Sequence, residues 1–151
     1  MTDYAALKAA DAALPDAPLP VDEAAAALNA QTRAVTIDIA SRDAREVLLV
    51  SGEWGGVVIL SNSAPSTSLP AQIVGAAIVL RDTLTLTETL HTSDDAVVAK
   101  VGTLLGALGS QGAGVLSDTT ISTLLGMRNV TRPVWQPAVT AGDIQTARAQ
   151  P

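Results

Sequence analysis

The sequence contains no cysteine and no phenylalanine, and it has only one histidine, one tyrosine and two tryptophans among 151 residues. The absence of cysteine excludes a disulfide framework and thiolate chemistry, and a single histidine leaves too few ligands for a structural zinc site. A core without phenylalanine must be built from Ala, Val, Leu and Ile, whose small side chains each bury little apolar surface. Burial against neighbouring subunits would stabilise such a core, so the composition gives a first indication of assembly.

Basic residues are also few and scattered. Nine Lys and Arg stand against 15 Asp and Glu, and the net charge is −6. The lack of a basic cluster argues against nucleic acid as a partner and against a polybasic membrane anchor. The longest apolar run, Ile73–Leu80, is far shorter than the roughly 20 residues of a membrane span. The N-terminus is acidic where a signal peptide would be basic, so we expect no secretory signal and synthesis in the cytoplasm.

Hydrophobic periodicity predicts an all-α or nearly all-α fold, a single domain over residues 1–151 with about six or seven short helices. The chain is organised around the stretch Thr92–Gly109. Ser93 is its expected N-cap, and its apolar positions share one helical face: Val97, Val101, Leu104, Leu105 and Leu108.

The remaining helices are placed by capping residues and by the proline-rich connector at residues 14–20. Thr2, Ser41, Ser117 and Thr140 are the expected N-caps. The predicted helical ranges are 3–13, 21–31, 42–51, 53–61, 71–89, 118–128 and a short last helix after Thr140. The end of the 71–89 segment alternates and is rich in threonine, so a strand is the alternative there.

One or two extended segments are expected beside the helices. Ala34–Ala40 alternates apolar and polar residues and is the strongest strand signal in the chain. Its partner is either Val130–Val134 or a strand of another chain, and an extended linker is the alternative interpretation. Residues 129–139 contain two prolines and are expected to be extended as well.

Both tryptophans are candidates for a protein interface, because Trp is enriched at binding hot spots. Trp54 is either an exposed anchor or the main aromatic residue of the core. Trp135 lies in a proline-flanked segment that either docks on a partner or folds back on its own core. Arg132 could stack on this indole or pair with an acidic residue. The predicted interface residues are therefore Trp54, Arg132, Pro133, Trp135 and Pro137.

No catalytic, cofactor-binding or metal-binding residue is predicted, and no small-molecule ligand is evident. His91, Asp94 and Asp95 lie close together in the sequence, but helix capping accounts for both carboxylates. The glycine-rich pieces GEWGG and GSQGAG lack the lysine and the spacing of phosphate-binding loops. With one histidine, no Ser-His-Asp arrangement can be argued from the sequence.

Several stretches resemble a family of small uncharacterised proteins of tailed bacteriophages that are encoded among structural or tail genes. The resemblance rests on four segments whose order and spacing are similar along most of the chain: TDYAALKAA with the following AALNA, SGEWGGVVIL, HTSDDAVVAKVGTLLGALGSQGAGVLS and PAVTAGDIQTARA. The segment Asn129–Pro137 departs from the family pattern. No catalytic residues are known in this family, so none are transferred.

The resemblance implies a non-enzymatic structural component of a phage virion, associated with the tail or baseplate. Its partners would be other virion proteins and copies of itself, in numbers set by the symmetry of the particle. Three other classes are alternatives: a head decoration or cement protein, an assembly or regulatory factor absent from the mature particle, and a small enzyme.

Overall fold

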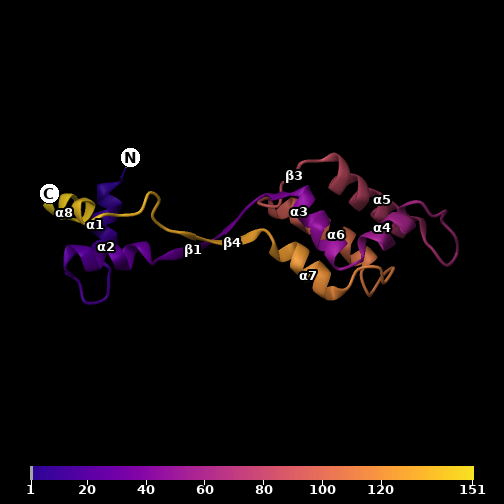
Figure 1. Cartoon of the computed structure of the whole chain (residues 1–151), viewed down its shortest axis with the longest axis horizontal. Helices are drawn as coiled ribbons and strands as arrows, with labels where there is room; N and C mark the ends of the chain where they lie inside the picture. Colours follow the sequence, from indigo (N-terminus) through magenta and orange to yellow (C-terminus); the bar gives the residue numbers. More distant parts are fainter. Residues whose placement is uncertain (1) are drawn as a thin grey trace. The chain divides into compact units, whose positions relative to one another are not determined.

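The computed structural model describes residues 2–151, which are mostly helical but include four short strands (Figure 1). Eight helices lie in this range, one at each of the eight segments placed from the sequence, although the overall number expected was about six or seven: α1 Tyr4–Ala12, α2 Val21–Asn29, α3 Ser41–Val50, α4 Trp54–Ser61, α5 Ala71–Leu86, α6 Asp95–Leu108, α7 Asp118–Gly126 and α8 Ala141–Ala149. The strands are β1 Thr32–Thr36, β2 Ile39–Ala40, β3 Thr89–Leu90 and β4 Asn129–Pro133. The expectation of a mostly helical fold is confirmed, although the protein is not purely α-helical.

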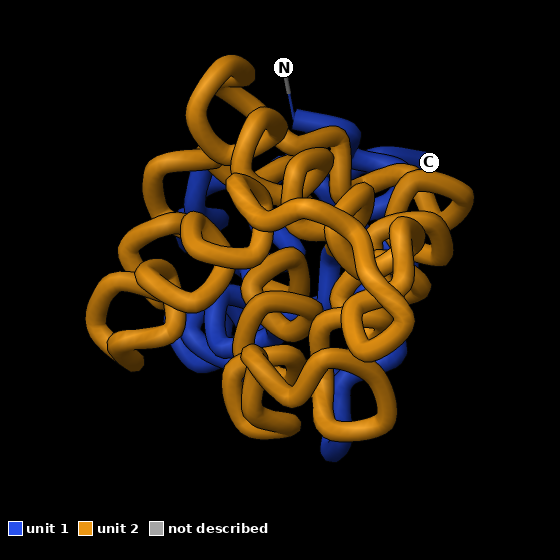
Figure 2. Tube along the Cα trace, turned by 90° about the vertical axis from the view of Figure 1, so that its right-hand side faces the viewer, with its two compact units in different colours: residues 1–35, 131–151 blue, residues 36–130 orange. Residues whose placement is uncertain are grey.

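The described chain divides into two compact units, which Figure 2 shows in different colours. Unit 1 consists of residues 1–35 and 131–151, and unit 2 is the continuous segment 36–130 between them. Within unit 1 the connector at residues 14–20 joins α1 to α2, as its three prolines predict. The single domain over residues 1–151 stays a prediction.

Unit 1 is built from α1, α2 and α8 around a small aliphatic core. Its buried residues are Leu7, Leu14, Ala24, Ala25, Leu28, Val139, Ile144 and Ala147. Alanine makes up three of these positions, so the helices approach one another without bulky side chains between them. Tyr4 and Trp135 pack against the edge of this core and supply its aromatic surface.

Unit 2 holds the larger core, to which all five of its helices contribute. Its buried residues are Ala44, Leu48, Val57, Ala77, Leu80, Leu84, Leu105, Leu108, Leu116 and Leu124. The predicted inner face of α6 is correct at Leu105 and Leu108, which are buried. Val101 and Leu104 are only partly buried and pack against the same core.

The strand prediction for 34–40 is confirmed as extended backbone, but the strand is not continuous. β1 forms a two-stranded sheet with β4, which is one of the two partners that the sequence left open. The strand is interrupted at Ile37 and Asp38, and β2 then pairs antiparallel with β3, with Ile39 opposite Leu90. The prediction that helix 71–89 continues to residue 89 is wrong, because α5 ends at Leu86 and Thr89 enters β3.

Two of the predicted N-caps are confirmed. Ser117 accepts a hydrogen bond from the Thr120 N–H at the start of α7, and Thr140 forms a reciprocal capping box with Asp143 at the start of α8. In both helices the side-chain oxygen of the cap accepts the backbone N–H three positions later, which has no partner within the helix, as the sequence predicts.

Three predicted N-caps are wrong, each by one residue. Asp3 caps α1 in place of Thr2, and Asp94 caps α6 in place of Ser93. In both cases an aspartate is the cap instead of the neighbouring hydroxyl residue, because a carboxylate accepts strong hydrogen bonds and carries the negative charge that a helix N-terminus favours. Ser41 is the first residue of α3 rather than its cap, and its hydroxyl lies 3.0 Å from that of Thr87.

Candidate interaction surfaces

Trp135 lies at the edge of the core of unit 1, on the loop that follows β4. Its ring is half-buried against this core, and its indole N–H is buried without a hydrogen-bond partner in the described structure. The loop is held down by Asn29, whose side-chain amide bonds the Val139 N–H and C=O, each at 2.8 Å. Trp135 thus contacts the core of its own unit, which is one of the two interpretations that the sequence offers.

A hollow of about 210 Å³ opens beside this loop. Trp135 and Pro137 line it together with Asp3 and Asp143, the two carboxylates at the starts of α1 and α8. Hydrogen bonds from the Thr140 hydroxyl and backbone N–H lower the pKa of Asp143, and the Tyr4 hydroxyl adds a weaker bond. Both carboxylates are thus occupied as helix caps, and the hollow is polar on that side.

The other predicted interface residues do not gather at one place. Pro133 and Arg132 are exposed on β4, and Arg132 forms no ion pair with any residue in the range 2–151. Trp54 begins α4 in unit 2, where it is half-buried against the large core. Trp54 thus combines a core contact with an exposed part, and the interface role of all five residues stays a prediction.

Unit 2 carries the large apolar side chains that are most exposed. Val50 at the end of α3 is 83% exposed, Ile59 on α4 is 70% exposed and Leu86 at the end of α5 is 80% exposed. Leu49 and Val79 are also exposed. Sequence reasoning missed these residues. One signal was available in α4, WGGVVILS, which is apolar on all sides although an ordinary surface helix has a polar face.

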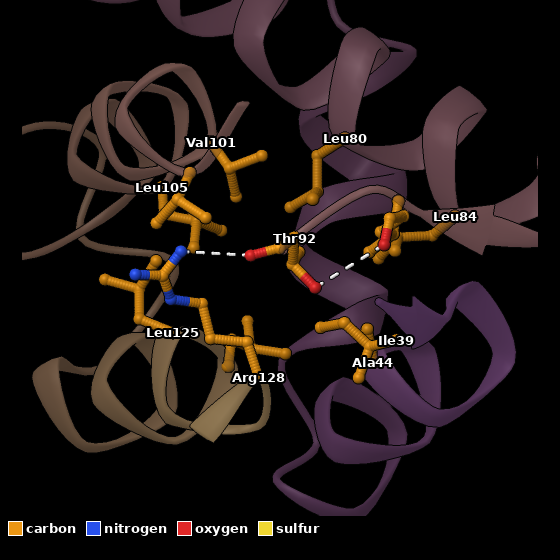
Figure 3. A pocket seen from close by; sticks show the side chains of 12 residues that line it. Ile39, Ala44, Leu80, Leu84, Thr92, Val101, Leu105, Leu125 and Arg128 are labelled. Atoms are coloured by element: carbon orange, nitrogen blue, oxygen red, sulfur yellow. Dashed lines mark hydrogen bonds between the residues drawn. The ribbon is translucent and has the colours of Figure 1, made fainter. Parts of the chain in front are cut away.

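An apolar cavity of about 30 Å³ lies inside unit 2, between α5, α6 and α7 (Figure 3). Leu80, Leu84 and Leu105 are among its lining residues, and Arg128 closes one side by donating to the Thr92 carbonyl at 3.0 Å. Its volume would admit little more than a water molecule, and apolar walls offer water few partners. We therefore interpret this cavity as a packing gap in the core rather than as a ligand site.

Asp38, His91 and Ser93 come together in unit 2 and combine the residue types of a hydrolytic triad. The Asp38 carboxylate lies 3.0 Å from His91 Nδ1 and accepts the Ser93 hydroxyl at 2.5 Å and the Ser93 N–H at 3.0 Å. In a triad the histidine would stand between the serine and the carboxylate. Here both bond the carboxylate directly, so the arrangement tethers the turn before α6 to the link between β1 and β2.

The hydrogen bonds of this tether lower the pKa of the Asp38 carboxyl group. The Ser93 hydroxyl, then the Ser93 N–H and His91, lower the pKa of Asp38 from 3.8 to about 2. Thr92 adds a neighbouring bond from its hydroxyl to the Ile37 carbonyl at 2.8 Å. Ser93, which the sequence placed as a helix cap, therefore acts as a donor to Asp38 instead.

The acidic residues near His91 in the sequence serve separate structural roles. Asp94 caps α6, and Asp95 pairs with Arg128 at 2.7 Å. Among residues 2–151 no group of three or more His, Cys, Asp or Glu side chains is placed to hold a metal ion. In the same range no helix is both long enough and apolar enough to cross a lipid bilayer.

Comparisons with known proteins returned no match: no family model, no curated protein and no solved structure resembles the chain significantly.

Proposed function

We propose that this protein is a non-enzymatic structural component of a tailed-phage virion, in the tail or baseplate region, and that it acts by binding other proteins. Two independent observations support the proposal. The order of four segments along the sequence resembles that of phage proteins encoded among structural and tail genes. The observation that carries the binding role is the set of exposed apolar side chains on unit 2.

These side chains are large, and they lie on ordered helices. Most of the surface of Val50 and Ile59 is exposed to water. Full burial of one such side chain against a partner would contribute roughly 1.5–3 kcal/mol to the free energy of binding. Exposed apolar side chains of this kind, when they gather on one surface, mark sites of protein interaction. α4 is apolar around its whole circumference, and this pattern is typical of helices that are completely buried. A partner that covers the outer side of α4 would complete this burial.

Mass spectrometry of purified, gradient-banded particles from the source phage, with heads and tails separated, tests the location. We expect the protein in the tail fraction at a stoichiometric level, while an abundant host protein serves as the marker for contamination. Detection in the head fraction would instead identify a head decoration protein. Absence from both fractions would overturn the virion proposal and leave an assembly factor or a small enzyme as the alternatives.

A substitution at Ile59 tests whether the exposed surface performs the binding. We expect Ile59→Glu to fold, because the side chain is 70% exposed, but to disappear from particles when it replaces the wild-type protein. Gln72→Glu adds the same charge at an exposed position of α5 and is the matched control. Equal incorporation of both variants would show that the outer side of α4 is not the binding surface.

A further inference from the structure

α5 and α6 form an apolar groove on unit 2, with a volume of about 150 Å³. Val79 and Leu80 are among the residues that line it from α5, and Val101 and Leu104 line it from α6. The only polar side chains in the lining are those of Thr83 and Lys100. Because such walls offer few hydrogen bonds to water, the groove favours an apolar side chain as its occupant.

The same surface also carries a projecting apolar side chain. Leu86, the last residue of α5, is 80% exposed. Val79, Thr83 and Leu86 follow one another at i, i+4 and i+7, so they share one face of the helix. Val79 and Thr83 line the groove, and Leu86 continues their row. One helix face therefore presents both a hollow and a side chain of the kind that would fill it.

Opposite charges accompany the hollow and the projection. Lys100 lines the groove and is the only charged residue of α6 after Asp95. Glu88 follows Leu86 by two residues and is the only charged residue between Thr83 and Leu90. Both side chains are exposed, and within residues 2–151 neither takes part in an ion pair. The hollow thus has a basic neighbour and the projecting leucine an acidic one, and Glu88 also lines a second hollow with Arg42 and Arg45 of its own chain.

We propose that α5 and α6 form a contact between two copies of this chain related by a two-fold axis. Leu86 of each copy enters the groove of the other, and Glu88 faces Lys100 of the partner subunit. In a two-fold contact each pairing occurs twice, because the same patch serves both subunits. A second copy is favoured over a different protein because this patch carries both an apolar hollow and an exposed leucine, and both a basic and an acidic side chain. The contact does not depend on a place in a virion.

Sedimentation equilibrium of the full-length chain over a concentration series tests the contact. We expect a reversible monomer–dimer equilibrium whose dissociation constant rises at least tenfold in Leu86→Ser. Val50→Ser removes an apolar side chain of similar exposure from α3 and should change the constant less than twofold. A wild-type chain that is monomeric throughout, or an equal effect of the two variants, would overturn the proposal.

Charge exchange tests the pairing itself. Glu88→Lys and Lys100→Glu should each weaken the dimer, because each places like charges opposite one another, and the double variant should restore it. Glu46→Lys makes the same change of net charge as Glu88→Lys, at an exposed position of α3, and should leave the dimer intact. A double variant as weak as the single ones would overturn the pairing. Rings or open polymers with the same residue dependence would overturn the two-fold geometry.

Discussion

Asp11 on α1 and Arg148 on α8 form a two-pronged ion pair, although they lie 137 positions apart in the chain. Arg148 Nε and Nη2 donate to the two Asp11 carboxylate oxygens at 2.7 and 2.8 Å, and Nη2 also donates to the Leu19 carbonyl at 2.8 Å. Asp11 is only 6% exposed. One arginine therefore joins the first helix of unit 1, its last helix and the connector between α1 and α2.

Removal of the Asp11 carboxylate should destabilise unit 1. We expect Asp11→Ala to lower the free energy of unfolding by about 3 kcal/mol, because Arg148 loses its partner in a partly buried place. Urea denaturation followed by circular dichroism measures this loss. Asp43→Ala breaks the exposed pair with Arg42 and should cost less than about 1 kcal/mol. Equal costs for the two variants would contradict a stabilising role of the Asp11 pair.

The Asp38 tether should make stability depend on pH in the acid range. Its pKa is about 2 in the folded protein against 3.8 for an ordinary Asp, so the carboxylate stabilises the fold fully above pH 4. As the pH falls from 4 to 2 the unfolded chain binds the proton first, and this stabilisation is lost. Thermal melting at stepped pH should therefore show that wild type and Asp38→Asn converge below pH 4. A constant difference between them would contradict the shifted pKa.

Titration of Asp38 by carboxyl NMR separates the contributions to the tether. The Ser93 hydroxyl is the largest cause of the lowered pKa, and His91 contributes less than either Ser93 group. We therefore expect Ser93→Ala to raise the pKa of Asp38 more than His91→Ala does. The reverse order would show that the histidine is the principal partner of the carboxylate.

Trp135 should contribute to the stability of unit 1 through its ring rather than through its indole N–H. Trp135→Ala should destabilise the unit, but by less than the roughly 3–5 kcal/mol typical of a fully buried Trp, because the ring is half-buried. Trp135→Phe should cost much less, since it keeps an aromatic ring and removes a buried N–H that has no partner. Thermal melting compares the variants. If Trp135→Phe lost as much stability as Trp135→Ala, the indole N–H rather than the ring would be the stabilising group.

The sequence leaves the partner of β1 open between β4 and a strand of another chain, but its local patterns predict the helices and the extended segments. These features depend on neighbours within a few residues or on alternation along one segment, as at Ser117 and Thr140. The tether of Asp38 to Ser93 joins positions 55 residues apart, and no local pattern distinguishes it from ordinary capping. The exposure of Leu86 likewise depends on where α5 ends and on which of its faces α6 covers.

The predicted inner face of α6 shows the same limit. Spacing groups Leu104 with Leu105, but only Leu105 is fully buried, while Leu104 also lines the groove beside α5. We expect Leu105→Ala to cost about 2–5 kcal/mol and Leu104→Ala distinctly less. Chemical denaturation of the two variants compares the same chemical change at adjacent positions. A larger cost at Leu104 would contradict the orientation of α6.

Two glycines near the end of α6 should respond to alanine in opposite directions. Gly106 lies inside the helix with no atom within 4 Å of an added Cβ, so Gly106→Ala should stabilise the protein by up to about 1 kcal/mol through helix propensity.

At Gly112 an added Cβ would lie 2.1 Å from the Ala107 carbonyl oxygen. That oxygen belongs to the backbone and already accepts the Ala113 N–H at 3.0 Å, so relief of the clash requires the turn itself to move. Gly112→Ala should therefore destabilise the protein by about 1–3 kcal/mol. Urea denaturation measures the change in the free energy of unfolding for both variants. If both variants were stabilised, the turn after α6 would have to accommodate the added Cβ at Gly112 without cost.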